Sequence, residues 1–311
     1  MSVLMLVAGL TLLFFSGDWL VKASVEIARY LKVSTLVIGV TVVAFGTSAP
    51  ELLVSLKAVF SGSPDISIGN VVGSNIANIA LVLGAVSIIL PIKVKNKALW
   101  IDWSVMMFAS LLFYIFAYDR TVGLIEGICF IVLLIIYLLW SVFKSRLDSK
   151  KQGEQIKEPT LALWKAILLL LLASVGLYLG SEWLVSGAKS IAAALNVSDR
   201  VIGISVVAFG TSVPELATSL IAAFRKETDI SIGNIIGSNI FNLLGVIGVT
   251  SILKPLNVSL QIIQFDVLVM VFVAFLLLVM IIPLKRGVLT RWKGAILVAL
   301  YAAYMFILFA N

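Results

Sequence analysis

The sequence predicts an all-α polytopic membrane protein with two related halves. First, 61% of its 311 residues are hydrophobic, only 13% are charged, and the mean hydropathy is +1.14. A soluble globular chain has roughly 45–50% apolar and about 25% charged residues. Second, apolar runs of the length that crosses a hydrocarbon core of about 30 Å recur along the whole chain. Third, the same polar motifs occur once in each half.

Ten apolar segments are expected to cross the membrane. The first is a span and not a signal peptide, because the run at 3–15 lacks a basic leading region and a small-residue cleavage site. The predicted spans are 2–21, 36–60, 66–90, 99–117, 122–143, 161–185, 200–224, 230–253, 260–283 and 290–309.

One hydrophilic stretch divides the chain. Residues 144–159, KSRLDSKKQGEQIKEP, are too few for a domain and are interpreted as a solvated linker between halves 1–143 and 160–311. If spans alternate in direction, 18 of the 23 Lys and Arg residues fall in loops on the linker's side. The positive-inside rule then places the linker in the cytoplasm and both termini outside the cell membrane.

The net charge of +7 does not indicate a nucleic-acid partner, because the cations lie in short loops between apolar runs. The chain has no histidine and one cysteine, Cys129, so it lacks the commonest zinc ligand and cannot form an internal disulfide. We therefore expect lipid as the surroundings, no resident cofactor, and a chain that functions as a monomer.

An internal repeat is the strongest organisational signal. When the chain is shifted by 164 residues, 16–84 aligns on 180–248 without a gap, and 38 of the 69 positions are identical. Each half contains five spans, an odd number, so the second half must enter the membrane in the opposite sense. Transporters built from such inverted repeats place their binding site at the repeat interface near the bilayer midplane.

The first repeated motif is AFGTSAPE at 44–51 and AFGTSVPE at 208–215. Pro50 removes an amide donor from its helix and Gly46 weakens the same turn, so we expect a kinked or unwound backbone there. This would free the carbonyls of Ala44 and Thr47. Irregular backbone survives at membrane depth only where it is buried in protein or lines a wet cavity.

The polar side chains of this motif share one side of the helix. Thr47 and Glu51 are four residues apart, and Ser48 lies beside them. The second copy offers the same groups from Ala208, Thr211, Ser212 and Glu215. All are hard oxygen ligands, which suit Ca²⁺ with its about six to eight oxygens at roughly 2.3–2.6 Å.

The second repeated motif is GNVVGSNIAN at 69–78 and GNIIGSNIFN at 233–242. It adds oxygen from Ser74 and Asn78, which are four residues apart, and from Ser238 and Asn242. Its paired glycines allow a neighbouring helix to approach closely, which would bring the asparagines to the two glutamates. These pairs are Gly69 with Gly73 and Gly233 with Gly237.

Glu51 and Glu215 differ from the other acids of the spans. They lie about fifteen residues into their segments, roughly 20 Å along a helix. A carboxylate at that depth costs several kcal/mol and is functional by default. No basic residue lies at matching depth, so a cation from solution is the natural partner. An interfacial or capping role is expected for Asp18, Glu182, Asp102, Glu126 and Asp266, which lie near span ends.

The paired GTSxPE and GNxxGSNIxN motifs resemble the two alpha repeats of the sodium/calcium exchanger family, within the calcium/cation antiporter superfamily, and indicate a prokaryotic member. The resemblance covers all ten spans and implies Na⁺/Ca²⁺ antiport. It implies that Glu51 and Glu215 are shared ligands of the ions, that the carbonyls of Ala44 and Ala208 serve flanking sodium sites, and that Asn78 and Asn242 lie at the centre. The sites would be completed by Thr47, Ser48, Thr211, Ser212, Ser74 and Ser238.

Position 242 is informative within this resemblance. Potassium-dependent members and some prokaryotic exchangers have aspartate there, whereas this chain has Asn242. The site therefore carries two formal negative charges, which match one Ca²⁺, and a potassium-independent exchanger is expected. The linker 144–159 is also too short for the regulatory domain of animal exchangers.

Alternative functions remain open at this level. A proton-coupled calcium exchanger could load protons on a carboxylate with a raised pKa. An intramembrane hydrolase with two acidic residues belongs to another class, but such a site needs two aspartates that share a proton, and the hydroxyls and asparagines fit ion coordination better. A channel is a further alternative, although two occluding carboxylates fit a carrier better.

Overall fold

The computed structural model describes residues 2–62, 64–93, 98–152, 158–194, 208–282 and 287–310. The all-α fold is confirmed. The first half contains α1 (Ser2–Leu31), α2 (Thr35–Ile38), η1 (Gly39–Val43), α3 (Ala44–Phe60), α4 (Pro64–Ala77), η2 (Asn78–Leu83), α5 (Gly84–Ile89), α6 (Ala98–Phe116), η3 (Ala117–Asp119) and α7 (Leu124–Gln152).

The second half has elements that correspond to most of those in the first, although the residues equivalent to α2 and η1 lie outside the described ranges. It contains α8 (Leu163–Ala194), α10 (Ala208–Thr211), α11 (Val213–Phe224), α12 (Thr228–Ile240), η5 (Phe241–Ile247), α13 (Gly248–Leu253), η6 (Ile262–Asp266), α14 (Val267–Ile281) and α15 (Arg291–Ala310). Here η1, η2, η5 and η6 are π-helical turns and η3 is a 3₁₀ turn.

Within the described ranges, nine helical segments are long and apolar enough to cross a membrane, and α11 is a shorter apolar helix. The N-terminal part of the span predicted at 200–224 lies outside the described residues. Three helices extend beyond the predicted ends, because helix-forming polar residues continue each helix after its apolar run. Thus α1 reaches Leu31, α8 reaches Ala194, and α7 enters the predicted linker as far as Gln152.

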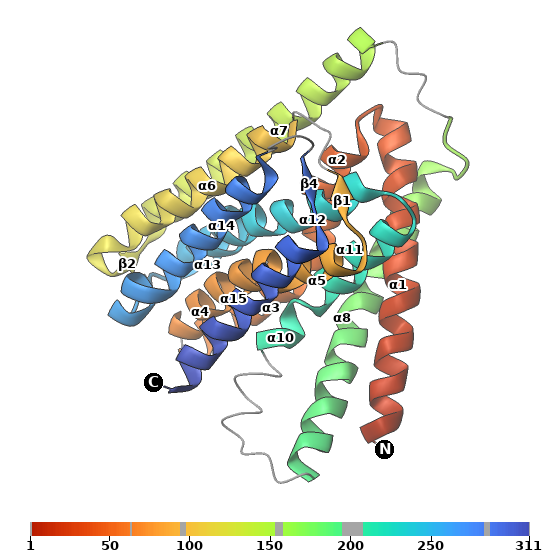
Figure 1. Cartoon of the computed structure of the whole chain (residues 1–311). Helices are drawn as coiled ribbons and strands as arrows, with labels where there is room; N and C mark the ends of the chain where they lie inside the picture. Colours follow the sequence, from red (N-terminus) through yellow and green to blue (C-terminus); the bar gives the residue numbers. More distant parts are fainter. Residues whose placement is uncertain are drawn as a thin grey trace.

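Two short antiparallel ladders connect loops that are distant in sequence. Strand β1 (Ile92–Lys93) pairs with β4 (Val288–Leu289), and β2 (Thr121–Val122) pairs with β3 (Leu256–Asn257). Each ladder joins two loops that the alternating order of spans places on the same side of the membrane. The ends of the chain also lie at the same end of the bundle (Figure 1).

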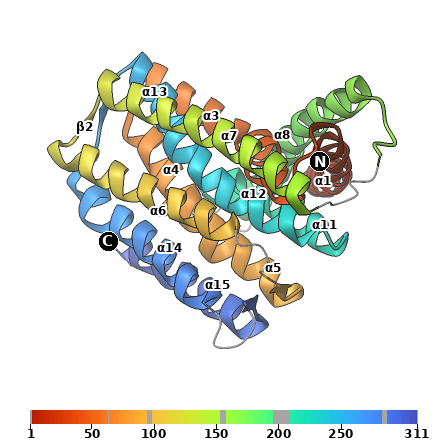
Figure 2. The same cartoon turned by 90° about the horizontal axis from the view of Figure 1, so that it is seen from above.

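Helices α1 and α8 lie side by side and form a pair at one edge of the remaining bundle (Figure 2). Glycines permit their close approach. A Cβ atom on Gly9 would lie 2.6 Å from the backbone nitrogen of Leu184, and one on Gly180 would lie 3.0 Å from that of Leu13. The pair meets the rest of the bundle through both acid-bearing helices, with α1 against α11 and α8 against α3, and also through α2, η1 and α10.

Helices α4 and α12 occupy the interior. The glycine pair of α12 has the predicted packing role, since a Cβ atom on Gly233 would lie 2.8 Å from the Leu36 carbonyl oxygen and one on Gly237 would lie 2.5 Å from Val40 Cα. The residues equivalent to Leu36 and Val40 in the second repeat, 200 and 204, lie outside the described residues. The packing role of the α4 pair, Gly69 and Gly73, therefore stays a prediction.

The surface of the bundle is apolar and much of its interior is polar. Large hydrophobic side chains such as Phe14, Ile125 and Phe306 are exposed, whereas both glutamates and most hydroxyls and asparagines of the two motifs are buried. A soluble monomer rarely exposes so much contiguous apolar surface. The chain is therefore a multi-pass membrane protein with a polar centre.

Candidate functional site

The two midspan glutamates are both completely buried, Glu51 on α3 and Glu215 on α11. Ser48 Oγ donates a hydrogen bond of 3.3 Å to Glu215 Oε1, which connects the acid-bearing helices of the two repeats. Glu51 and Glu215 are also close enough to interact electrostatically. The tertiary structure therefore brings one carboxylate from each repeat to a common place.

Hydroxyl groups extend this cluster to α4 and α12. Thr47 Oγ1 lies 3.0 Å from Asn234 Oδ1, 3.3 Å from Ser238 Oγ and 3.3 Å from the carbonyl oxygen of Ala44. In the mirrored position, the Thr211 and Ser74 hydroxyls lie 3.3 Å apart. Each of these hydroxyl contacts across the repeats joins the first motif of one repeat to the second motif of the other.

The third group of residues consists of Asn78 and Asn242, which are both fully buried. Asn78 is the first residue of η2, and Asn242 is the second residue of η5. Such π-helical turns are rare and occur often at functional sites, because they displace side chains from the regular helical register. Helix α3 packs against η5 and α11 against η2, so each asparagine belongs to a segment that contacts the acid-bearing helix of the other repeat.

Several oxygens of this cluster lack a hydrogen-bond donor among the described residues. They are Glu51 Oε1 and Oε2, Glu215 Oε2, Asn78 Oδ1, Asn242 Oδ1 and Ser212 Oγ. Buried polar atoms are almost always hydrogen-bonded, and a buried charge without a partner costs several kcal/mol or more. Neither glutamate forms a salt bridge within the described part of the chain; the ion pairs there involve Asp18 and Glu26. The arrangement therefore concentrates oxygen acceptors that a cation would satisfy.

Of the kinked or unwound backbone predicted for the first copy, the unwinding is wrong, and the kink stays a prediction. Helix α3 runs through Pro50 without interruption, and the irregular turn lies before it, at η1. Proline removes only one backbone hydrogen bond, and burial of Thr47, Ser48 and Glu51 holds the remaining turns together. The second copy does break, at Ser212 between α10 and α11.

The carbonyl oxygens of Ala44 and Ala208 were the backbone ligands expected for sodium. Ala44 begins the uninterrupted helix α3, so the unwinding expected to free its carbonyl is absent, and its role as a sodium ligand stays a prediction. Ala208 begins α10, directly after residues outside the described ranges, so its role stays a prediction.

Sequence reasoning missed three asparagines at the centre. Asn234 Oδ1 faces Thr47, while Asn75 and Asn239 bond to Asn242 and Asn78. The signal was available, because each copy of the second motif contains three asparagines, of which we singled out only the last.

Two other acids are more buried within the protein than we expected. Asp102 and Asp266 are buried, and each accepts a hydrogen bond of 2.8 Å, from Tyr137 and Tyr304 respectively. Each acid therefore bonds to a side chain of another helix, which is not the capping role that we expected, whereas the interfacial placement stays a prediction. Their tyrosine partners come from α7 and α15, so the pairs connect neighbouring helices.

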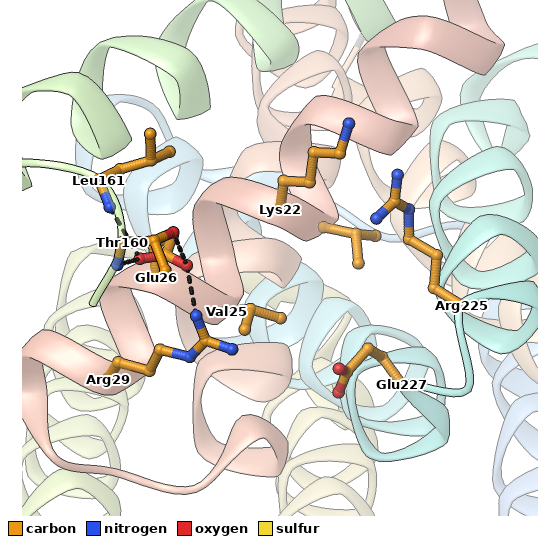
Figure 3. Close-up of a pocket in the computed structure, with 9 residues that line it drawn as sticks. Lys22, Val25, Glu26, Arg29, Thr160, Leu161, Arg225 and Glu227 are labelled. Atoms are coloured by element: carbon orange, nitrogen blue, oxygen red, sulfur yellow. Dashed lines mark hydrogen bonds and ion pairs between the residues drawn. The ribbon is translucent and has the colours of Figure 1, made fainter. Parts of the chain in front are cut away.

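A cavity of about 490 Å³ lies between α1, the segment before α8 and the turn between α11 and α12 (Figure 3). Glu26 lines it and accepts backbone hydrogen bonds from Thr160 (2.6 Å) and Leu161 (3.2 Å). Burial and the nearby Asp229 raise the pKa of Glu227, while Arg29 and Arg225 act in the opposite direction. The lining contains charges of both signs, and neither midspan glutamate belongs to it.

The sodium/calcium exchanger protein family matches residues 1–143 and 165–310 of the chain. The sodium/calcium exchanger MaX1 of Methanosarcina acetivorans is 32% identical over 345 residues, which cover 98% of each chain. The inner membrane protein YrbG of Escherichia coli is 34% identical over 264 residues, covering 81% of this chain and 79% of its own.

Solved structures agree with these relatives. The sodium-calcium exchanger NCX_Mj soaked with 10 mM Na⁺ and 10 mM Sr²⁺ is 37% identical, has a TM-score of 0.83, and covers 100% of this chain and 98% of its own. The same exchanger soaked with zero Na⁺ and Ca²⁺ gives a TM-score of 0.84. With a match along nearly its whole length and a fold shared at this level of identity, the chain belongs to the sodium/calcium exchanger protein family.

Proposed function

We propose that this chain is a secondary antiporter that exchanges Na⁺ for Ca²⁺ by alternating access and does not require K⁺. Family membership supports a transporter of the cation/calcium exchange type. The coupling ion, the ion-binding residues and the transport cycle are the parts that we add.

One observation carries the assignment of the site. Glu51 and Glu215 come from opposite repeats, are fully buried, and together present three carboxylate oxygens without a donor among the described residues. Two carboxylates balance the charge of one Ca²⁺, and neutral oxygens of Asn78, Asn242 and the surrounding hydroxyls raise the number of hard ligands. The same oxygens suit Na⁺, so the two ions would compete.

Competition for the same carboxylates explains obligatory exchange. Two ionised glutamates in a low-dielectric interior are costly without a cation, which disfavours movement of the empty carrier. The resemblance to a potassium-dependent site ends at Asn242, which holds no formal charge. A third cation is therefore not needed for neutrality when one Ca²⁺ is bound.

The α1–α8 pair is the part of the bundle that we propose to move. It packs as a unit through glycines and touches the acid-bearing helix α11 on one side. Sliding of this pair across the central helices would expose the site to each side of the membrane in turn. The positive-inside bias orients the carrier with residues 144–159 in the cytoplasm.

The experiment that tests this function is calcium flux in proteoliposomes. Vesicles that contain the purified chain and internal Na⁺ are diluted into Na⁺-free buffer with radioactive Ca²⁺. We expect uptake that collapses when the Na⁺ gradient is removed and that is unchanged when K⁺ is replaced by choline. A K⁺ requirement would overturn the potassium-independent assignment.

Proton-coupled calcium exchange is the nearest rival, because the same carboxylates can carry protons. An imposed pH gradient without a Na⁺ gradient distinguishes the two, and calcium uptake driven by pH alone would support the rival. A channel would instead give currents that reverse at the Ca²⁺ equilibrium potential, independent of Na⁺.

A further inference from the structure

We propose that Asn75 and Asn239 are positioning residues for ion exchange. They fix which end of the Asn242 and Asn78 amides faces the ions. Asn75 lies on α4 and Asn239 on α12, and each is only 1% exposed. This inference rests on the proposed function above, and it adds residues that do not themselves coordinate the ions.

The argument begins with a backbone carbonyl. Asn75 Nδ2 donates a hydrogen bond of 3.2 Å to the carbonyl oxygen of Asn239. A carbonyl oxygen only accepts, so this contact determines which end of the Asn75 amide is the nitrogen. The remaining atom, Asn75 Oδ1, must then accept, and it faces Asn242 Nδ2 at 3.1 Å. Asn242 Oδ1 is consequently the atom that stays without a donor among the described residues.

The second repeat contains the same chain of bonds. Asn239 Nδ2 donates to the carbonyl oxygen of Asn75 at 3.2 Å, and Asn239 Oδ1 accepts from Asn78 Nδ2 at 3.0 Å. Two backbone carbonyls therefore determine the orientation of four amides. Because every one of these bonds crosses between the repeats, the two central oxygens are held by a single reciprocal network.

Two methionines complete the surroundings of the positioning residues. Met270 Sδ lies 3.7 Å from Asn75 Nδ2, and Met106 Sδ lies 3.7 Å from Asn239 Nδ2. Sulfur is a weak acceptor, so these contacts occupy the second N–H of each amide without competing with the carbonyl. All the polar side-chain atoms of Asn75 and Asn239 are thus engaged away from the cluster of unpartnered oxygens.

Orientation has a direct consequence for a cation. An asparagine that presents Oδ1 offers a ligand, whereas the reversed amide presents N–H groups and repels the ion. The network also favours an amide at position 242, because an ionised aspartate there could not donate to Asn75 Oδ1. Asn75 and Asn239 therefore help to define the site as one with two negative charges and two neutral central oxygens.

A double-mutant cycle on calcium binding tests this proposal. Equilibrium Ca²⁺ binding is measured on the purified full chain for Asn75→Ala, Asn242→Ala and the double variant. Loss of a residue that orients a metal ligand typically lowers affinity by about 10–100-fold. We expect each single variant to raise Kd about tenfold and the double variant to bind within about twofold of Asn242→Ala, because groups that act through each other are not additive.

The mirrored cycle with Asn239→Ala and Asn78→Ala is expected to give the same coupling. Ser87→Ala is the matched control, since Ser87 is also buried but its hydroxyl donates to the carbonyl of Leu83, one turn earlier in the same span, at 2.7 Å. It should leave Kd unchanged and add nothing to Asn242→Ala. Additive losses at positions 75 and 242, or an unchanged Kd for Asn75→Ala, would overturn the positioning role.

Folding is controlled separately. Asn75→Leu has a similar volume without polar atoms and replaces the alanine variant if that chain does not fold. Failure of both to fold would also reject the proposal, because Asn75 would then be required by the fold itself. The proposed function fails by a different result, namely sodium-driven uptake that survives Glu51→Gln, so the two ideas can be rejected independently.

Discussion

The two copies of the GTSxPE motif have nearly the same sequence but different local structures. In the first repeat the helix continues through the motif, and Ser48 donates to the carboxylate of the other repeat. In the second, the helix breaks at Ser212, whose hydroxyl has no partner among the described residues. Correspondingly, Glu215 has one hydrogen-bonded oxygen, whereas both oxygens of Glu51 lack a donor there.

The two repeats also differ where the bundle contacts the α1–α8 pair. Asp18 on α1 forms an ion pair with Arg225 at the end of α11. The equivalent positions in the other repeat, 164 residues away, are Glu182 and Ser61, which cannot form such a pair. The central asparagines, in contrast, are almost perfectly mirrored. The central asparagines are thus arranged symmetrically, whereas the contacts of the α1–α8 pair are not. This is what we expect if the structure represents one of the two states of the alternating-access carrier that we propose.

Replacement of the two acids is expected to have the largest effect. Glu51→Gln and Glu215→Gln should each reduce sodium-driven calcium uptake by about a hundredfold or more, because a midspan carboxylate is functional by default. Removal of an unpaired buried charge should also raise the melting temperature of the ion-free chain, and more so for Glu51→Gln, since Glu215 already accepts from Ser48.

Asp266→Asn is the matched control for these variants. It also changes a buried acid to an amide within a span, and the new side chain can still accept from the Tyr304 hydroxyl. Flux close to that of the parent chain is expected. Equal changes in melting temperature for Glu51→Gln and Glu215→Gln would show that the hydrogen bond from Ser48 to Glu215 does not make the two acids differ in their effect on stability.

Ion removal should affect the two halves unequally. Saturating Ca²⁺ at a hundred times its dissociation constant stabilises a protein by about 2.7 kcal/mol, and chelation in Na⁺-free buffer removes this. The helix whose glutamate has both oxygens without a donor, α3, should loosen further than α11, where Glu215 keeps one hydrogen bond from Ser48. In hydrogen exchange we therefore expect residues 44–60 to lose more protection than 213–224. Equal losses in both segments would contradict this comparison.

The paired serines should differ in importance. Ser48→Ala removes a hydrogen bond to a buried carboxylate, a kind of bond worth about 1.5–3 kcal/mol, and should weaken Ca²⁺ binding about tenfold. Ser212→Ala removes a hydroxyl without a described partner and should cost no more than about twofold. Titration of Ca²⁺ into each purified variant gives both values. Reversal of the order would mean that the opposite conformation predominates in solution.

The ion pair at the edge is expected to have the smallest effect. Arg225→Gln breaks a partly exposed link between α1 and α11, and such pairs contribute less than about 1 kcal/mol. We expect an unchanged Kd for Ca²⁺ and an exchange rate about twofold higher, because α1 is less tightly held. Lys22→Gln is the control, as Lys22 pairs with the same Asp18 but within α1 (Figure 3 shows both cations). Equal exchange rates for the two variants would show that the Asp18–Arg225 ion pair does not limit the movement of α1.

Much of the fold was accessible without coordinates. Apolar run lengths identified the spans, and the 164-residue repeat with five spans per half required opposite orientations of the halves. The helix ends were less accurate, because polar segments such as 22–31 and 144–152 continue a helix by propensity, although they do not resemble membrane-spanning sequence.

Most residues of the candidate site could also be selected from the sequence, since polar groups in an apolar segment are costly and stand out, although their role as ion ligands stays a prediction. Glu51, Glu215, and the hydroxyls and asparagines in the same motifs were recognised in this way. Asn75 and Asn239 were not, because their role depends on backbone carbonyls of another helix, which no spacing rule reveals. The buried acid–tyrosine pairs were missed for the same reason.

The sequence by itself thus determined that two mirrored halves each bring one acid to membrane depth. Only the tertiary structure decided that Ser48 and not Ser212 reaches a carboxylate, that the helix breaks in one copy alone, and which ends of the central amides are left without a hydrogen-bond partner among the described residues. The physical reason is that hydrogen bonds between helices depend on how neighbouring segments pack. The same local sequence therefore has different hydrogen-bond partners in the two repeats.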